Sequence, residues 1–167
     1  VKVAVARQDI EVIHPLVNYK GLGLLDGSLQ ELQEALKSAH KAGKGIYGMK
    51  PLGGGNLIRD VDTALHFAFS LPYLHSVAVG CKTPEELAYN ISIMEGKEPS
   101  ADLKRIIRSI PRKLHIEEWC QGCGECVKKC PAKLLEIREG RAVLKKESCL
   151  FCGYCGAACP QFAIKVL

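Results

Sequence analysis

The sequence lacks long apolar runs and has few aromatic residues. Its 167 residues include only four Phe, five Tyr and one Trp. No stretch reaches the roughly 18 apolar residues needed to cross a bilayer, and the most apolar one, residues 64–79, is interrupted by His66, Pro72 and His75. No signal peptide is visible. These absences predict a cytoplasmic protein without a membrane partner, and the ordinary share of apolar and charged residues excludes a disordered chain.

Cysteine, by contrast, is abundant and clustered. Of nine cysteines, eight lie in residues 120–159 and only Cys81 lies elsewhere. They form two runs of the pattern C-x2-C-x2-C-x3-C-P, a spacing that resembles the bacterial ferredoxins with their 4Fe–4S clusters. In such runs the fourth cysteine ligates the other cluster, because it cannot turn back to its own. The predicted metal ligands are therefore Cys120, Cys123, Cys126 and Cys159 for cluster I, and Cys149, Cys152, Cys155 and Cys130 for cluster II.

Disulfides and zinc are the two alternative uses of these cysteines. Disulfides suit small secreted domains, but no secretory segment is present. Zinc is usually held by two separated C-x2-C pairs, whereas each run here has four cysteines and ends in proline. The spacing favours two 4Fe–4S clusters. The repetition of the motif favours electron transfer over a purely structural role, because two adjacent clusters make a relay.

Positive charge is concentrated in the same part of the chain. Residues 111–167 contain ten lysines and arginines against six acidic residues, while residues 1–110 are nearly balanced. A basic module is compatible with nucleic-acid binding. However, each oxidised cluster with its four thiolates carries a charge of about −2. Two clusters bring the module close to neutrality, so no nucleic-acid partner is expected.

Residues 1–110 alternate strand and helix signals. Strand-like runs at 11–18, 45–50 and 76–79 are each followed by a helix signal, with Ser28, Thr83 and Ser100 as predicted N-caps. This alternation predicts a parallel α/β sheet. Three parallel strands leave two open edges, so we expect a larger sheet, completed by a missing N-terminal barrel half or by a homo-oligomer.

A family resemblance follows from these strand ends. The segments IEVIHPLVN, GKGIYGMKPLGGGNL and HSVAVGCKTPEELAYNI resemble the last three strands of an aldo-keto reductase barrel. With the cysteine motifs behind them, the chain resembles the C-terminal part of ferredoxin-domain-containing aldo-keto reductase-like proteins. The resemblance implies an α/β fold: a partial (β/α)8 TIM barrel in residues 1–110, followed by a small α+β ferredoxin-type module in residues 111–167.

The resemblance also implies a nicotinamide site for NAD(P). Such barrels often bind phosphate at the loops after strands seven and eight. Those positions correspond to Lys50, Gly53 and Gly54 in one loop and to Lys82 in the other, while Asn90 matches an adenine-contacting position of the family. The family's catalytic Asp, Tyr, Lys and His lie on earlier strands, so no catalytic residue is assigned here.

The sequence thus predicts an iron–sulfur redox protein. Its ferredoxin module would relay electrons through two 4Fe–4S clusters to or from an aldo-keto reductase-like oxidoreductase domain that is incomplete in this chain. The alternative is a non-catalytic electron-transfer and docking module that serves a separate redox protein. In both cases a redox protein is the expected partner, and this chain alone is not expected to reduce carbonyl compounds.

Overall fold

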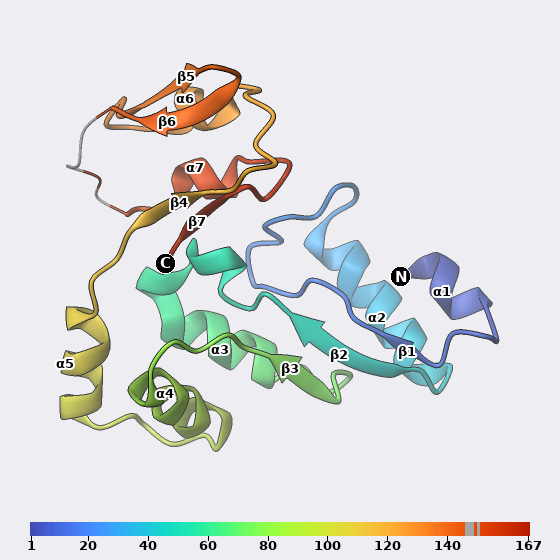
Figure 1. The fold of residues 1–167 in the computed structure, drawn as a ribbon. Coiled ribbons are helices and arrows are strands. Elements are labelled where there is room, and N and C mark those ends of the chain that lie inside the picture. Colours follow the sequence, from blue (N-terminus) through green and yellow to red (C-terminus); the bar gives the residue numbers. More distant parts are fainter. Residues whose placement is uncertain (146–148, 150) are drawn as a thin grey trace. The chain divides into compact units, whose positions relative to one another are not determined.

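The computed structural model describes residues 1–145, 149 and 151–167, and these divide into two units (Figure 1). The first unit contains Val1–Pro51 and Asp60–Ile110, and the second contains Leu52–Arg59 and Pro111–Leu167. The short segment Leu52–Arg59 therefore packs within the second unit although its sequence neighbours belong to the first. Within the described residues, no helix is both long enough and apolar enough to cross a membrane.

The first unit is a small parallel sheet with helices between its strands. Its strands β1 (Val12–Ile13), β2 (Gly45–Met49) and β3 (Ser76–Ala78) pair in the order β1-β2-β3. Ile13 lies opposite Ile46, and Gly48 lies opposite Val77. The helices are α1 (Lys2–Ala6), α2 (Leu29–Lys41), α3 (Val61–Phe69), α4 (Pro84–Met94) and α5 (Ala101–Ser109). The short η2 (Ile58–Asp60) precedes α3 in the chain, and its first two residues belong to the second unit.

Local side chains cap the starts of α2, α4 and α5, as the sequence predicts. The Ser28 side chain accepts a hydrogen bond from the Glu31 amide, and the Glu31 carboxylate accepts one from the Ser28 amide, which completes a capping box. Ser100 caps α5 by accepting from the Leu103 amide. Thr83 likewise accepts from the Glu86 amide. Thr83 and Glu86 have the spacing of a second capping box, but the Glu86 carboxylate accepts from the Lys82 amide.

The first predicted strand is much shorter than its apolar run. Residues 11–18 were expected to be extended throughout, but β1 covers only Val12–Ile13, with an isolated bridge from Leu16 to Met49. Pro15 lies between them and has no amide hydrogen to donate to the ladder. Its carbonyl still accepts from the Met49 amide at 2.9 Å, so the segment stays beside β2 without forming a continuous strand.

The core of the first unit forms where α2 covers the sheet. Val17, Leu36, Ala39, Ile46 and Tyr73 are buried together there. Among the described residues the sheet of this unit has three strands and does not close. The structure therefore shows a mixed α/β fold, and it provides no sign of the predicted barrel.

In its described residues, the second unit contains two antiparallel strand pairs and two short α-helices. Strands β4 (Leu114–Ile116) and β7 (Ile164–Val166) pair with each other, as do β5 (Leu135–Arg138) and β6 (Arg141–Leu144). The helices are α6 (Glu125–Lys129) and α7 (Tyr154–Ala157), and the short η1 (Gly53–Gly55) completes the unit. The apolar runs 134–137 and 142–144, with Gly140 between them, predict this β5–β6 hairpin, and the structure confirms it. Its turn residues Glu139 (φ 50°) and Gly140 (φ 74°) both have positive φ, as a type I′ turn requires.

Candidate metal centre

The two cysteine runs fold into similar loop-and-helix units. In each run a glycine with left-handed backbone, Gly124 (φ 82°) or Gly153 (φ 79°), precedes a short helix. These helices, α6 and α7, bury Cys126 and Cys155. Glycine has no Cβ and adopts the left-handed backbone without strain, so the chain can turn tightly between the second and third cysteines. The repeated spacing of the sequence is therefore matched by a repeated backbone conformation.

The similarity continues after the fourth cysteine of each run. Three residues beyond it, Lys133 and Phe162 have the same left-handed backbone, with φ of 52° at both positions. The turn brings the next amide back to the cysteine sulfur. In this way Leu134 N–H donates to Cys130 Sγ at 3.4 Å, and the Ala163 amide approaches the sulfur of Cys159 at 3.3 Å.

Two further amides point at cysteine sulfurs. The Ala142 amide donates to Cys120 Sγ at 3.5 Å, and the Phe151 amide donates to Cys149 Sγ at 3.4 Å. Backbone donors of this kind favour the thiolate form of cysteine, which is the form that ligates iron. The fold thus provides amide donors to predicted ligands in both runs.

Cysteines from both runs line a single cavity of the second unit. Cys130, the last cysteine of the first run, lines this cavity together with Cys149, Cys152 and Cys155. The rest of its wall is largely apolar and includes Leu114, Leu135 and Phe151. The cavity therefore brings together the four cysteines that the sequence assigns to cluster II.

The other three cysteines assigned to cluster I lie around the fourth, Cys126. Burial raises the pKa of the Cys126 thiol, and the nearby thiols of Cys120, Cys123 and Cys159 raise it further. Cys126 and Cys159 belong to the buried core of the unit, and Cys120 packs against it. These neighbours are the residues assigned to cluster I.

Burial has the same effect on the third cysteine of the second run. It raises the pKa of Cys155 to about 12, and the neighbouring thiols of Cys149, Cys152 and Cys126 contribute in the same direction. A metal must therefore displace protons from these buried thiols when it binds. Cys126 also acts on Cys155, and the helices α6 and α7 that carry them contact each other, so the two groups of cysteines are neighbours, as a relay between two clusters requires.

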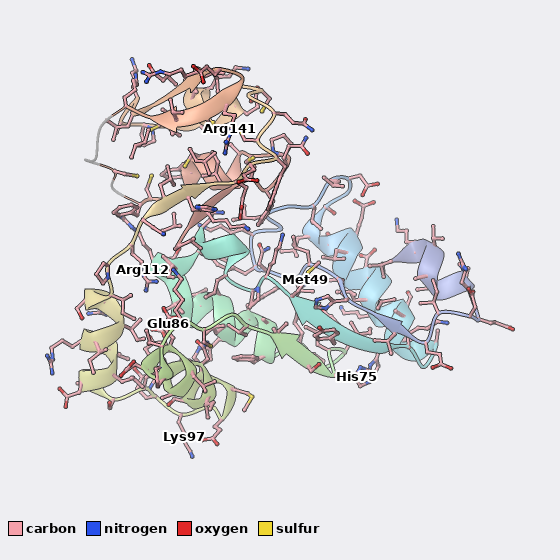
Figure 2. All side chains as sticks on the ribbon, in the orientation of Figure 1. Met49, His75, Glu86, Lys97, Arg112 and Arg141 are labelled. Atoms are coloured by element: carbon pink, nitrogen blue, oxygen red, sulfur yellow. The ribbon has the colours of Figure 1, made fainter. Side chains whose placement is uncertain are left out.

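Arg141 connects two strand segments of the second unit near these loops. Arg141, labelled in Figure 2, donates from its guanidinium to the carbonyl oxygens of Ile116 and Glu117 at 3.4 and 3.2 Å. It thereby links the β5–β6 hairpin to the end of β4.

Thiol ligands, left-handed loop residues and convergent amide donors all fit the binding of 4Fe–4S clusters.

Comparison with known proteins supports this fit. Residues 112–160 match a protein family described as the 4Fe-4S dicluster domain. An uncharacterized ferredoxin of Methanocaldococcus jannaschii is 40% identical over 50 residues, which are 28% of this chain and 81% of that protein. The chain belongs to the ferredoxins. The domain therefore shares iron–sulfur binding and electron transfer with the ferredoxin family.

Other relatives of this chain are larger proteins. The chain is 44% identical over 54 residues to one component of the ion-translocating oxidoreductase complex of Methanosarcina acetivorans, covering 32% of this chain and only 20% of that component. It is 28% identical over 86 residues to an uncharacterized polyferredoxin-like protein of M. jannaschii, covering 41% of this chain and 51% of that protein. No solved structure matches. These matches provide no support for an aldo-keto reductase half or for NAD(P).

The predicted nicotinamide residues of this ferredoxin are divided between its two units. Lys50, Lys82 and Asn90 belong to the first unit, and Gly53 and Gly54 belong to the second. The Lys82 amide donates to the carboxylate of Glu86, which Figure 2 labels, at 2.7 Å. The Asn90 side chain is 9% exposed and donates to Cys81 Sγ at 3.1 Å. The Lys82 amide and the Asn90 side chain, both predicted to contact the nucleotide, thus form hydrogen bonds with other residues of the protein.

The glycine loop of this predicted site is packed against the ferredoxin's own chain. A Cβ on Gly54 would lie 2.9 Å from the Phe162 ring, and one on Gly55 would lie 1.7 Å from the Val166 carbonyl oxygen. The Gly53 carbonyl accepts a hydrogen bond from the Asn56 side chain at 2.7 Å. The sequence therefore identified an unusual loop, but it missed that the loop packs beside β7, and it missed Asn56 altogether.

Proposed function

We propose that this chain transfers single electrons between redox proteins through two 4Fe–4S clusters with crossed ligation. One would be held by Cys120, Cys123, Cys126 and Cys159, and the other by Cys149, Cys152, Cys155 and Cys130. Each bound cluster would accept one electron and release it to the next acceptor. The observation that carries this proposal is the cavity shared by Cys130 with the three cysteines of the second run.

The protein's own contribution is to hold and surround the sulfurs. The amides of Leu134, Phe151, Ala142 and Ala163 supply hydrogen bonds to cysteine sulfur, which stabilise negative charge there. The apolar wall of the cavity limits contact with water, and solvent exposure is one of the factors that set a reduction potential. Both features serve electron transfer and neither requires a substrate site.

Paired cysteine substitutions test the crossed ligation. Cys130→Ala removes one ligand from the cluster of the second run, so roughly half of the bound iron becomes labile while the other cluster survives. Because Cys130 and Cys149 act on the same cluster, the double variant Cys130→Ala/Cys149→Ala should lose little more iron than Cys149→Ala alone. Cys130→Ala/Cys120→Ala should damage both clusters. Iron and sulfide content and the electron paramagnetic resonance spectra of the reduced protein report these losses.

Cys81 provides the matched control for these substitutions. It is the one cysteine outside the two runs and is exposed in the first unit. Cys81→Ala should leave the iron content and the spectra unchanged. If Cys130→Ala and Cys120→Ala together spare the cluster of the second run, ligation is local to each run and the crossed assignment is wrong.

For residues 1–110 we propose the oxidoreductase-like role that the family resemblance implies. The parallel order of β1, β2 and β3, each followed by a helix, supports this proposal. The alternative is that this half docks the ferredoxin domain onto a separate redox protein. Isothermal calorimetry of NADH and NADPH binding distinguishes the oxidoreductase-like role from the docking role. Binding that is weakened by Lys82→Ala and Asn90→Ala favours the oxidoreductase role, and absence of binding favours docking.

A further inference from the structure

Each cysteine run is packed by a different segment of chain. In the first run, a Cβ on Gly122 would lie 2.3 Å from the Gly140 carbonyl oxygen, so the β5–β6 turn lies directly on this loop. In the second run, a Cβ on Gly153 would lie 2.5 Å from the Asn56 carbonyl oxygen. The first contact lies within residues 112–160, which match the dicluster family. The second comes from a segment outside that match.

The side chain of Asn56 has a defined orientation in this contact. Its Nδ2 donates to the Gly53 carbonyl at 2.7 Å, which turns Oδ1 toward Gly156. A Cβ on Gly156 would lie only 2.0 Å from this oxygen. Asn56 Oδ1 is buried, and none of the residues that the structure describes donates a hydrogen bond to it. A buried carbonyl oxygen without a donor is uncommon and calls for an explanation.

The position of this oxygen connects it with the second cluster. Gly156 follows Cys155 directly, and its backbone amide acts to lower the pKa of the Cys155 thiol. The oxygen end of the Asn56 amide dipole therefore lies at the turn that holds a ligand. An electron added to a cluster increases the negative charge there, and a nearby partial negative charge disfavours that addition.

We propose that Asn56 is a positioning residue that lowers the reduction potential of the cluster held by the second cysteine run. It acts through the uncompensated oxygen that it holds against the Cys155 turn. The proposal rests on the proposed function, because it needs a cluster bound at Cys149, Cys152, Cys155 and Cys130. It makes the segment Leu52–Arg59 a functional part of the second unit.

Two substitutions of Asn56 with opposite expected effects test this proposal in the full chain. Asn56→Leu retains much of the side-chain volume but removes the oxygen, so the potential of one cluster should rise. Asn56→Asp retains an oxygen and adds negative charge, so the same potential should fall. Both variants lose the donor to the Gly53 carbonyl, so shifts in opposite directions cannot come from that loss. We expect each shift to change the ratio of reduced to oxidised cluster roughly tenfold, or 59 mV.

Redox titration monitored by electron paramagnetic resonance, with iron content measured in parallel, provides the readout. Glu139→Asn is the matched control, because it changes a polar residue of the turn that packs on the first run. Glu139→Asn should leave unchanged the reduction potential that the Asn56 variants shift. Equal shifts in the same direction for both Asn56 variants, or no shift with normal iron content, overturns the proposal. Absence of clusters from the unmodified protein would instead refute the proposed function.

Discussion

Replacing Gly55 by alanine probes whether Leu52–Arg59 is held against β7. Gly55 has a φ of +87°, and an added Cβ would lie 1.7 Å from the Val166 carbonyl oxygen and 2.8 Å from its carbon. Both atoms are backbone, and Val166 is paired with Leu114 in the β4–β7 ladder. Because neither side can yield by rotating a side chain, the contact must be relieved by moving the segment or the strand.

The expected loss has two parts. A left-handed backbone costs an L-residue about 1–2 kcal/mol, and overpacking a well-packed site costs typically about 1–3 kcal/mol. Gly140→Ala is the matched control in the same unit, since Gly140 has a φ of +74° but nothing within 4 Å of an added Cβ. Gly140→Ala should lose only the stability that the left-handed backbone costs. The difference between the two variants, about 1–3 kcal/mol, therefore isolates the packing contact.

Release of the clusters at a fixed urea concentration is a suitable assay, because unfolding of such proteins is often irreversible and is best followed as a rate. If the contact is absent from the unfolding transition state, Gly55→Ala should lose its visible absorption up to roughly 5–150 times faster than Gly140→Ala. Equal rates for the two variants would show that Gly55 is not packed against Val166. The segment Leu52–Arg59 would then not belong to the second unit.

Three further predictions concern local interactions and metal. Ser28→Ala removes the N-cap of α2 and should lower the free energy of unfolding of the first unit by about 1 kcal/mol, measured by denaturation followed by circular dichroism. Lys165, which pairs with Glu117, and then His115 hold the pKa of the Glu117 carboxyl below its usual value. This stabilisation should be present above the usual pKa and lost as pH falls through the lowered one. Lys165→Met should therefore reduce the loss of stability on acidification, and an unchanged acid transition would contradict this. Removing iron with a chelator should unfold the second unit, whose core includes cysteines of both runs, while the helical circular dichroism of α2 and α4 persists.

Several features of the fold could be read from the sequence because their causes are local. Ser28 with Glu31 predicts the start of α2, and Ser100 predicts the start of α5, since capping involves residues three positions apart. The Glu139–Gly140 turn follows from the backbone that a two-residue hairpin requires. The cysteine spacing likewise predicted iron–sulfur binding, which the family match supports. The crossed ligand assignment stays a prediction, although the cavity brings its four cysteines together.

Expectations that needed long-range information were less successful. The apolar run before β2 predicted a longer strand, but Pro15 interrupts the ladder once a partner strand has to be paired. The predicted barrel has no support in the three-stranded sheet that the structure describes. A nicotinamide site with Lys50, Gly53, Gly54, Lys82 and Asn90 stays a prediction, and NAD(P) has no support from the relatives.

The sequence by itself determined the cysteine motifs, the helix caps and the hairpin turn, because each depends on the conformational preferences of residues a few positions apart. Only the tertiary structure decided that Cys130 shares a cavity with the second run, and that Gly53–Gly55 and Asn56 pack within the ferredoxin unit. Three glycines after a strand are equally compatible with a phosphate loop and with close backbone packing. The choice between them depends on which distant strand lies beside the loop, and here β7, more than 100 residues further along the chain, occupies that place.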